Sequence, residues 1–150
     1  MSALTLSVRP LRIIPLLVTL LSIYTSIGNA QEKSAVQVVT LFVELYGGPD
    51  MDEIAEYTTP SFRGNKPKSV WVVDTWRALH KLQYKKLDST VVGSKVTSDK
   101  AIVITEAKLR TAAGEVAQKE IYYLVKQGER WLIDDLQVTD EEIDIDKVQL

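Results

Sequence analysis

The residues able to do chemistry in this chain are few in kind. There is no cysteine and a single histidine, His80. Zinc sites normally draw on Cys and His ligands, and a Ser-His-Asp hydrolase would need His80 together with a Gly-x-Ser-x-Gly turn that the sequence lacks. Walker and Gly-x-Gly-x-x-Gly phosphate loops are also missing. The sequence therefore predicts no metal and no cofactor.

Carboxylates and tyrosines are the remaining candidates for catalysis. A carboxylate can transfer a proton near neutral pH when burial in an apolar cavity raises its pKa, and a tyrosine hydroxyl can donate a hydrogen bond beside it. The acidic stretch at residues 140–146, by contrast, lacks the spacing and the glycine turn of a calcium-binding EF-hand loop. Whether any carboxylate is buried depends on the elements that position it, and these follow from the pattern along the chain.

The first 30 residues have the pattern of a secretory signal peptide. Their only charged side chains are Arg9 and Arg12, which precede an apolar run over residues 13–27 and the small residues Gly28-Asn29-Ala30. This order is typical of a segment that is cleaved on export. The alternative, a membrane anchor, would need about 20 apolar residues. We expect cleavage after Ala30 and a periplasmic or secreted product that spans no membrane.

Charge is distributed unevenly over the mature chain. Removing Arg9 and Arg12 changes the net charge from −2 to −4, which argues against binding to nucleic acid. Residues 63–86 sum to +6, whereas the segments before and after them sum to −5 each. This basic segment could hold an anion. The alternative is that these charges neutralise one another when the chain folds.

Three helices are predicted before residue 82. Ser34 is positioned to cap a helix over residues 35–46. Asp50 is positioned to cap a shorter one over residues 51–57. In a third helix, residues 69–81, the helical spacing predicts that one side is buried, formed by Val72, Val73, Trp76 and Leu79.

From residue 82 onward the apolar residues alternate, as in strands. The four predicted strands cover residues 83–96, 100–111, 116–126 and 131–138. Short links make neighbouring strands antiparallel hairpins, and Gly93 is a predicted bulge that would let the sheet curve. We expect a single α+β domain over residues 31–138, with N-terminal helices packed on a curved antiparallel sheet. An acidic C-terminal tail, residues 139–150, follows it.

One segment near the end of the predicted sheet supports a family resemblance. In Tyr122-Tyr-Leu-Val-Lys-Gln-Gly-Glu-Arg-Trp-Leu-Ile-Asp134, a glycine turn precedes Trp-x-Ile. Together with Gly-Gly-Pro-Asp and Thr-Pro-Ser-Phe earlier in the chain, it resembles the nuclear transport factor 2-like superfamily, which has a cystatin-like α+β cone. The resemblance spans residues 34–138 and implies the fold. It implies no single function, because members include isomerases, dehydratases, transport adaptors and small exported proteins without a known role.

The resemblance also implies the kind of acid–base site to expect. Isomerases of this superfamily pair an Asp base with a Tyr inside the cone, whereas its dehydratases use two histidines and this chain has one. The possible members of an Asp and Tyr site are Asp74, Asp135, Tyr57 and Tyr122. Strand alternation points Asp135 into the cone if Trp131 faces it. The alternative places Asp135 near the rim, paired with a Lys or Arg.

Two functions fit these candidates. The first is an exported, non-catalytic binding or interaction domain that holds a small, partly apolar ligand in its cone or associates with an envelope protein. Its ligand would contact Trp76, Tyr122, Trp131 and Asp135, unless the tryptophans belong to the core. The alternative is a cofactor-independent lyase or isomerase that uses an Asp and Tyr pair. A pocket with an inward carboxylate would favour the enzyme, and a cone filled by Trp and Phe would favour the interaction domain.

The third predicted strand is apolar on both faces. Tyr122 and Leu124 lie on one face, and Ile121 and Tyr123 on the other. An antiparallel sheet with one face in water would alternate apolar and polar residues, and three helices cover only the concave face. We therefore expect a homodimer through the convex face. The alternative is that the N-terminal segment or the acidic tail covers it.

Overall fold

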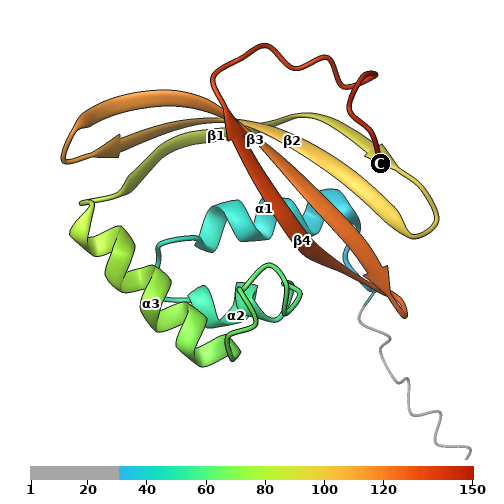
Figure 1. Ribbon diagram of the computed structural model, residues 1–150, viewed down its shortest axis with the longest axis horizontal. Coiled ribbons are helices and arrows are strands. Elements are labelled where there is room, and N and C mark those ends of the chain that lie inside the picture. Colours follow the sequence, from blue (N-terminus) through green and yellow to red (C-terminus); the bar gives the residue numbers. More distant parts are fainter. Residues whose placement is uncertain (1–30) are drawn as a thin grey trace, which may run out of the picture. The chain divides into compact units, whose positions relative to one another are not determined.

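The computed structural model describes residues 31–150 (Figure 1). The predicted signal peptide, residues 1–30, lies outside the described residues, so export and cleavage after Ala30 stay predictions. Within residues 31–150, no helix is both long and apolar enough to cross a membrane.

The first two helices begin where the sequence indicates, but only one is capped as predicted. In α1 (Ala35–Leu45), the Ser34 hydroxyl accepts a hydrogen bond from the Gln37 amide at 3.2 Å, and the Gln37 side chain accepts one from the Ser34 amide at 2.8 Å. Asp50 precedes α2 (Met51–Ala55) without a side-chain capping bond. The prediction that Asp50 caps this helix is wrong, because its backbone, with φ −99° and ψ 28°, lies outside the extended region that a capping residue adopts.

The third helix, α3 (Lys68–Lys81), forms as predicted but turns a different side inward. Trp71 is buried, and Val72 and Leu79 are half-buried. Val73 and Trp76 are 51% and 50% exposed, so the prediction that they are buried is wrong. The reason is that α3 packs mainly on α2 rather than against the sheet (Figure 1). Contact with α2 covers only a narrow side of α3.

Four strands form one antiparallel sheet in the order β1-β2-β3-β4. They are β1 (Lys85–Val96), β2 (Lys100–Thr111), β3 (Gly114–Gln127) and β4 (Arg130–Thr139). A register shift at Gly93 confirms the predicted bulge. The domain is therefore α+β, with N-terminal helices on one face of a curved antiparallel sheet, as predicted (Figure 1).

The main core lies between the inner face of the sheet and the helices. Its most enclosed side chains come from α1, α2 and three of the strands: Val38, Val39, Phe42, Met51, Ile54, Val103, Tyr122, Leu124 and Ile133. α1 lies across this face of the sheet and supplies several of these side chains (Figure 1).

The tail after β4 lies on the outer face of the sheet. Its apolar side chains Ile143, Ile145 and Val148 pack against a second buried cluster, formed by Ile102, Ile104 and Ile121. Gly93 permits this approach, because a Cβ atom at that position would lie 2.9 Å from Cδ1 of Ile145. The Lys95 ammonium also donates to the Val148 carbonyl at 3.1 Å. The tail therefore covers part of the face that the sequence assigns to a homodimer.

Candidate functional site

Glu120 on β3 is a buried carboxylate on the inner face of the sheet, only 5% exposed. Its Oε2 accepts hydrogen bonds from the Tyr122 hydroxyl at 2.6 Å and the Thr105 hydroxyl at 3.1 Å. Its Oε1 accepts one from the Gln118 amide at 3.0 Å. Alternation along β3, and the pairing of Glu120 with Thr105, bring these four residues together. In this Glu120 cluster, three donors replace the water that the carboxylate loses on burial.

Two further tyrosines and a lysine lie within electrostatic range of Glu120. They are Tyr46 at the end of α1, Tyr84 just before β1, and Lys86 in β1. Burial raises the pKa of Tyr84 and of Tyr122 above the ordinary value of 10.0, and the charge of Glu120 raises both further. Burial lowers the pKa of Lys86, which the charge of Glu120 partly opposes. The tyrosines therefore stay protonated near neutral pH.

A groove of about 570 Å³ opens along α3. Its apolar lining consists of Tyr46, Phe62, Trp71, Ala78, Leu79 and Leu82, and its charged lining of Arg63, Lys66 and Asp74. Packed rings run from this groove to the Glu120 cluster. The Phe62 ring lies 5.9 Å from that of Trp71 and 5.8 Å from that of Phe42, which lies 5.7 Å from that of Tyr122. A continuous row of packed aromatic rings therefore connects the groove to Tyr122, whose hydroxyl donates to Glu120.

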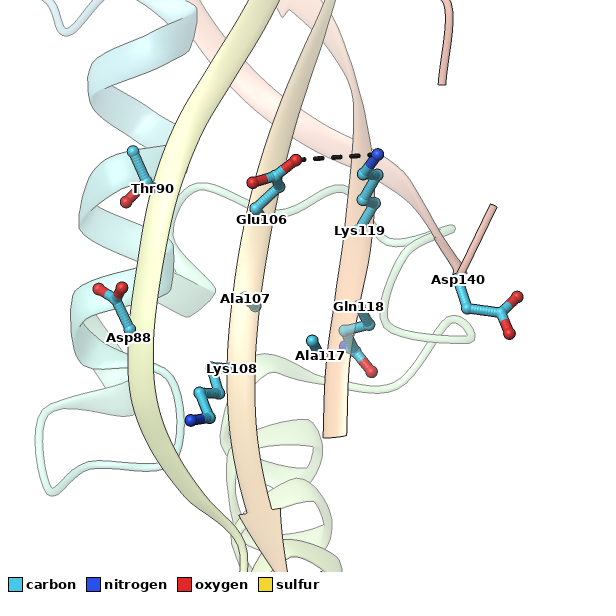
Figure 2. Close-up of a pocket in the computed structure, with 9 residues that line it drawn as sticks. All are labelled: Asp88, Thr90, Glu106, Ala107, Lys108, Ala117, Gln118, Lys119 and Asp140. Carbon is cyan, nitrogen blue, oxygen red and sulfur yellow. Dashed lines mark ion pairs between the residues drawn. The ribbon is translucent and has the colours of Figure 1, made fainter. Parts of the chain in front are cut away.

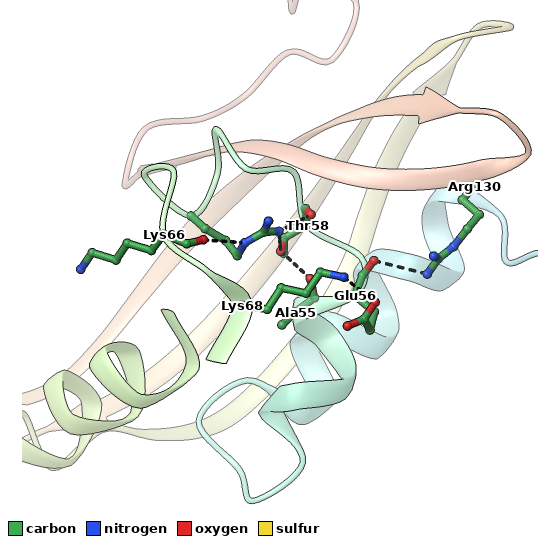
Figure 3. Close-up of polar contacts among 7 residues, drawn as sticks. Ala55, Glu56, Thr58, Lys66, Lys68 and Arg130 are labelled. Carbon is green, nitrogen blue, oxygen red and sulfur yellow. Dashed lines mark hydrogen bonds and ion pairs between the residues drawn. The ribbon is translucent and has the colours of Figure 1, made fainter. Parts of the chain in front are cut away.

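Arg63 shapes the loop of residues 58–66 beside this groove. Its Nη1 donates to the Thr58 carbonyl at 2.5 Å and to the Thr58 hydroxyl at 2.8 Å. Its Nε donates to the Lys66 carbonyl at 3.3 Å. Figure 3 draws the contacts that Thr58 and Lys66 make here. These bonds close the loop on itself and hold the guanidinium in one position at the groove.

Trp76 lines a second hollow, of about 490 Å³, on another side of α3. Its ring stacks on His80, with centroids 5.3 Å apart and planes 6° apart. Gly47, with φ 84°, forms part of the same hollow, and a Cβ there would lie 3.3 Å from the Tyr84 ring. Trp76 therefore borders a surface hollow and is separate from the packed aromatic core.

Tyr122 points into the core as expected, but Asp135 does not. The register shift in β4 leaves Asp134 as an extra residue, so that Ile133 faces the core while Asp135 pairs with Tyr123 on the outer face. Asp135 is exposed. The prediction that strand alternation points Asp135 inward is wrong, because a bulge reverses the alternation beyond it.

The other candidates from the sequence make their contacts elsewhere. The Tyr57 hydroxyl accepts a hydrogen bond from Lys33 at 3.1 Å. Asp74 pairs with Lys66 at 2.8 Å at the groove, and this hydrogen bond and charge lower the pKa of Asp74. Trp131 is buried, with 8% exposure, in the main core. The structure therefore does not bring the four Asp and Tyr candidates into one site.

The sequence-based candidates omit Glu120, although a signal for it exists. Glu120 has the same strand parity as Tyr122 and Leu124, which assigns all three to one face. No comparable signal connects Tyr84 or Lys86 to that face, because Lys86 belongs to β1, Tyr84 precedes it, and β2 lies between β1 and β3 in the sheet.

Figure 2 shows a further hollow, of about 360 Å³, on the outer face of the sheet. Glu106 and Lys119 form an ion pair across it at 3.8 Å, and Lys119 also pairs with Glu142 of the tail. Lys108, also in the lining, pairs with Glu115, so both lysines that line this hollow have carboxylate partners. Within residues 31–150, no group of three or more His, Asp or Glu side chains is arranged to hold a metal ion.

Solved structures similar to this chain share its architecture, whereas no protein-family model and no curated protein matches it. A SEC-C motif-containing protein from Rhodopseudomonas palustris is 23% identical over 71% of this chain and 80% of its own, with a TM-score of 0.57. A candidate ketosteroid isomerase from Shewanella frigidimarina is 18% identical over 73% and 98%, with a TM-score of 0.53. The domain has a nuclear transport factor 2-like fold.

A third neighbour with this fold was solved with a small molecule. It is a ketosteroid isomerase-like protein from Catenulispora acidiphila in complex with trimethylamine, 9% identical over 71% of this chain and 86% of its own, with a TM-score of 0.51. At identities this low the likeness establishes the nuclear transport factor 2-like fold alone.

Proposed function

We propose that this domain binds a small, partly apolar molecule in the groove along α3. The observation that carries the proposal is the groove itself: about 570 Å³ of space with a mainly aromatic and aliphatic wall and three charged residues in its lining. Ligand sites typically have a volume of about 300–1,000 Å³ and combine apolar walls with a few polar groups. The trimethylamine complex of the Catenulispora acidiphila neighbour supports the proposal, since it places a small molecule on a related architecture.

Filling the groove tests this function. Ala78 lines the groove, and Ala78→Trp should reduce ligand binding at least about 10-fold by occupying the space. Native mass spectrometry of protein purified from its own host would show whether a small molecule accompanies the wild type and is lost from the variant. Val73→Trp is the matched control, because Val73 lies on an exposed side of the same helix. Equal ligand loss from both variants, or none from Ala78→Trp, would contradict the proposal.

Proton transfer at the Glu120 cluster is the second candidate function. A buried carboxylate 2.6 Å from a tyrosine hydroxyl has the composition of an acid–base pair, and it replaces the Asp and Tyr pair expected from the sequence. Deuterium uptake from D2O into the α-carbons of small ketones, followed by NMR, tests this reaction class. We expect uptake with the wild type and none with Glu120→Gln. Equal uptake with both proteins would count against Glu120 as the base.

The proposed setting of this function is outside the cytoplasm. It rests on the sequence pattern of residues 1–30, with Arg9 and Arg12 before an apolar run and Ala30 at the cleavage site. N-terminal sequencing of the protein from culture medium or periplasm should give a chain that begins at Gln31. Recovery of intact Met1 in a membrane fraction would contradict it. In this location the domain could also associate with an envelope protein, in addition to binding a ligand.

A further inference from the structure

Arg63 is a buried cation in the lining of the groove, 8% exposed. Its three hydrogen bonds go to uncharged acceptors: the carbonyl and the hydroxyl of Thr58 and the carbonyl of Lys66. No ion pair within residues 31–150 includes Arg63. Burial therefore removes most of the hydrating water from the Arg63 guanidinium, and no carboxylate in contact balances its positive charge. Burying an unpaired charge costs free energy.

Two carboxylates in the surroundings of Arg63 pair with lysines: Asp74, which lines the same groove, and Glu56, on which the charge of Arg63 acts. Asp74 pairs with Lys66 at 2.8 Å. Glu56 pairs with Lys68 at 2.5 Å (Figure 3). The pKa of Glu56 is lowered chiefly by its hydrogen bond to Lys68, and the charge of Arg63 is the smallest of the contributions. Each lysine thus has its own counterion at short range, and the guanidinium does not.

The bonds that hold the loop leave part of the guanidinium free. A guanidinium has five N–H donors, and the Nη2 group of Arg63 makes none of the hydrogen bonds described for residues 58–66. This nitrogen is also not sealed away: within residues 31–150, the one enclosed side-chain nitrogen or oxygen without a partner is Ser89 Oγ. Arg63 therefore lines the groove with N–H donors that have no hydrogen-bond partner in residues 58–66, while Nη1 and Nε fix the orientation.

The apolar wall of the groove includes the same loop. Phe62, next to Arg63 in the chain, packs against Trp71 with ring centroids 5.9 Å apart and planes tilted by 59°, and Leu79 continues this wall along α3. A molecule in the groove would contact an aromatic and aliphatic surface and a fixed, unbalanced cation at once. We propose that Arg63 is an anion subsite and that the ligand of this groove is a partly apolar carboxylate, an inference that rests on the proposed ligand-binding function.

Three ligands of equal chain length test the subsite. Isothermal titration calorimetry of the purified protein would use octanoate, octan-1-ol and octylammonium, which have eight carbon atoms each and end in a carboxylate, a hydroxyl and an ammonium group. We expect octanoate to bind at least about 10-fold more tightly than the other two, the effect of one charge-assisted hydrogen-bonded contact. Arg63→Gln should reduce octanoate affinity to that of octan-1-ol and leave octan-1-ol affinity unchanged. Lys81→Gln, which removes a cation of α3 that does not line the groove, should change neither affinity.

The outcomes separate this inference from the proposed function. Equal affinity for octanoate and octan-1-ol overturns the anion subsite but leaves ligand binding in the groove intact. Absence of binding by all three ligands overturns both. Arg63 also holds the loop, so a salt series on the wild type provides a test that needs no variant: octanoate affinity should fall several-fold between about 0.05 and 0.5 M NaCl, with octan-1-ol unaffected. A flat salt response for octanoate overturns the subsite.

Discussion

Tyr122 donates the shortest hydrogen bond of the Glu120 cluster, and both partners are buried. A hydrogen bond to a charged group contributes about 1.5–3 kcal/mol to stability, and the enclosed carboxylate would lose one of its donors without it. We expect Tyr122→Phe to lower the free energy of unfolding by that amount at pH 8, measured by urea denaturation. Tyr123→Phe is the control, because Tyr123 lies on the outer face and its hydroxyl contact is long, at 3.4 Å.

The contribution of Tyr122 should depend on pH in one direction. Its pKa is raised in the folded protein, chiefly by burial, above the ordinary 10.0 of an unfolded chain. The stabilisation is complete below pH 10 and is lost as the pH rises above 10, because the unfolded chain then releases a proton that the folded chain retains. Urea titrations between about pH 9 and 11 should therefore show the wild type and Tyr122→Phe converging in stability. A constant difference across this range would contradict the assigned direction.

At the scale of the elements, Trp131 in β4 is packed in the core, whereas Trp76 in α3 lies at the surface. Trp131 is 8% exposed and Trp76 is 50% exposed. Truncation of a buried aromatic costs about 3–5 kcal/mol, whereas a half-exposed side chain on a helix costs less than about 1 kcal/mol. Urea denaturation of Trp131→Ala and Trp76→Ala should give these two values. A loss below about 1 kcal/mol for Trp131→Ala would mean that Trp131 is free to contact a ligand or partner.

The bulge at Gly93 connects β1 to the tail. A Cβ atom at this position would lie 2.9 Å from Cδ1 of Ile145, so Gly93→Val should push the tail away and leave the strand pairing in place. We expect faster amide hydrogen exchange in residues 143–148 of the variant, with protection of β2 unchanged. Ser94→Val, which alternation places on the other face of the strand, should leave exchange in the tail unaltered. Unchanged exchange in Gly93→Val would contradict this packing.

At the scale of the whole molecule, the outer face of the sheet has an apolar surface that either the tail or a second copy of the chain could cover. Residues 143–148 pack on Ile102, Ile104 and Ile121. We propose that a homodimer through this face forms when the tail is removed, because an uncovered apolar patch favours association. Sedimentation equilibrium at micromolar concentration should give a doubled mass for a chain truncated after Thr139, and Tyr123→Glu should restore the monomer. A truncated chain that stays monomeric would contradict a dimer through this face.

The sequence by itself determined the features that depend on nearby residues. Ser34 marks the start of α1, Gly93 marks a bulge, and turn residues separate four alternating strands. Together these local signals were enough for an α+β domain with helices on one face of an antiparallel sheet. The cap at Ser34, the turns and the alternation succeed because they depend on neighbours a few positions away, whereas the predicted cap at Asp50 does not form.

Only the tertiary structure decided which side chains meet. An extra residue at Asp134 turns Asp135 to the outer face, since one inserted position reverses every side chain beyond it. Glu120 becomes a candidate site residue only when Thr105 on the next strand and Tyr84 before β1 are brought around it. The groove along α3 forms where this helix lies beside Tyr46, at the end of α1, and the loop of residues 58–66. The bulge, the Glu120 cluster and the groove all depend on contacts between segments that are distant in the sequence. A local sequence pattern does not specify such contacts.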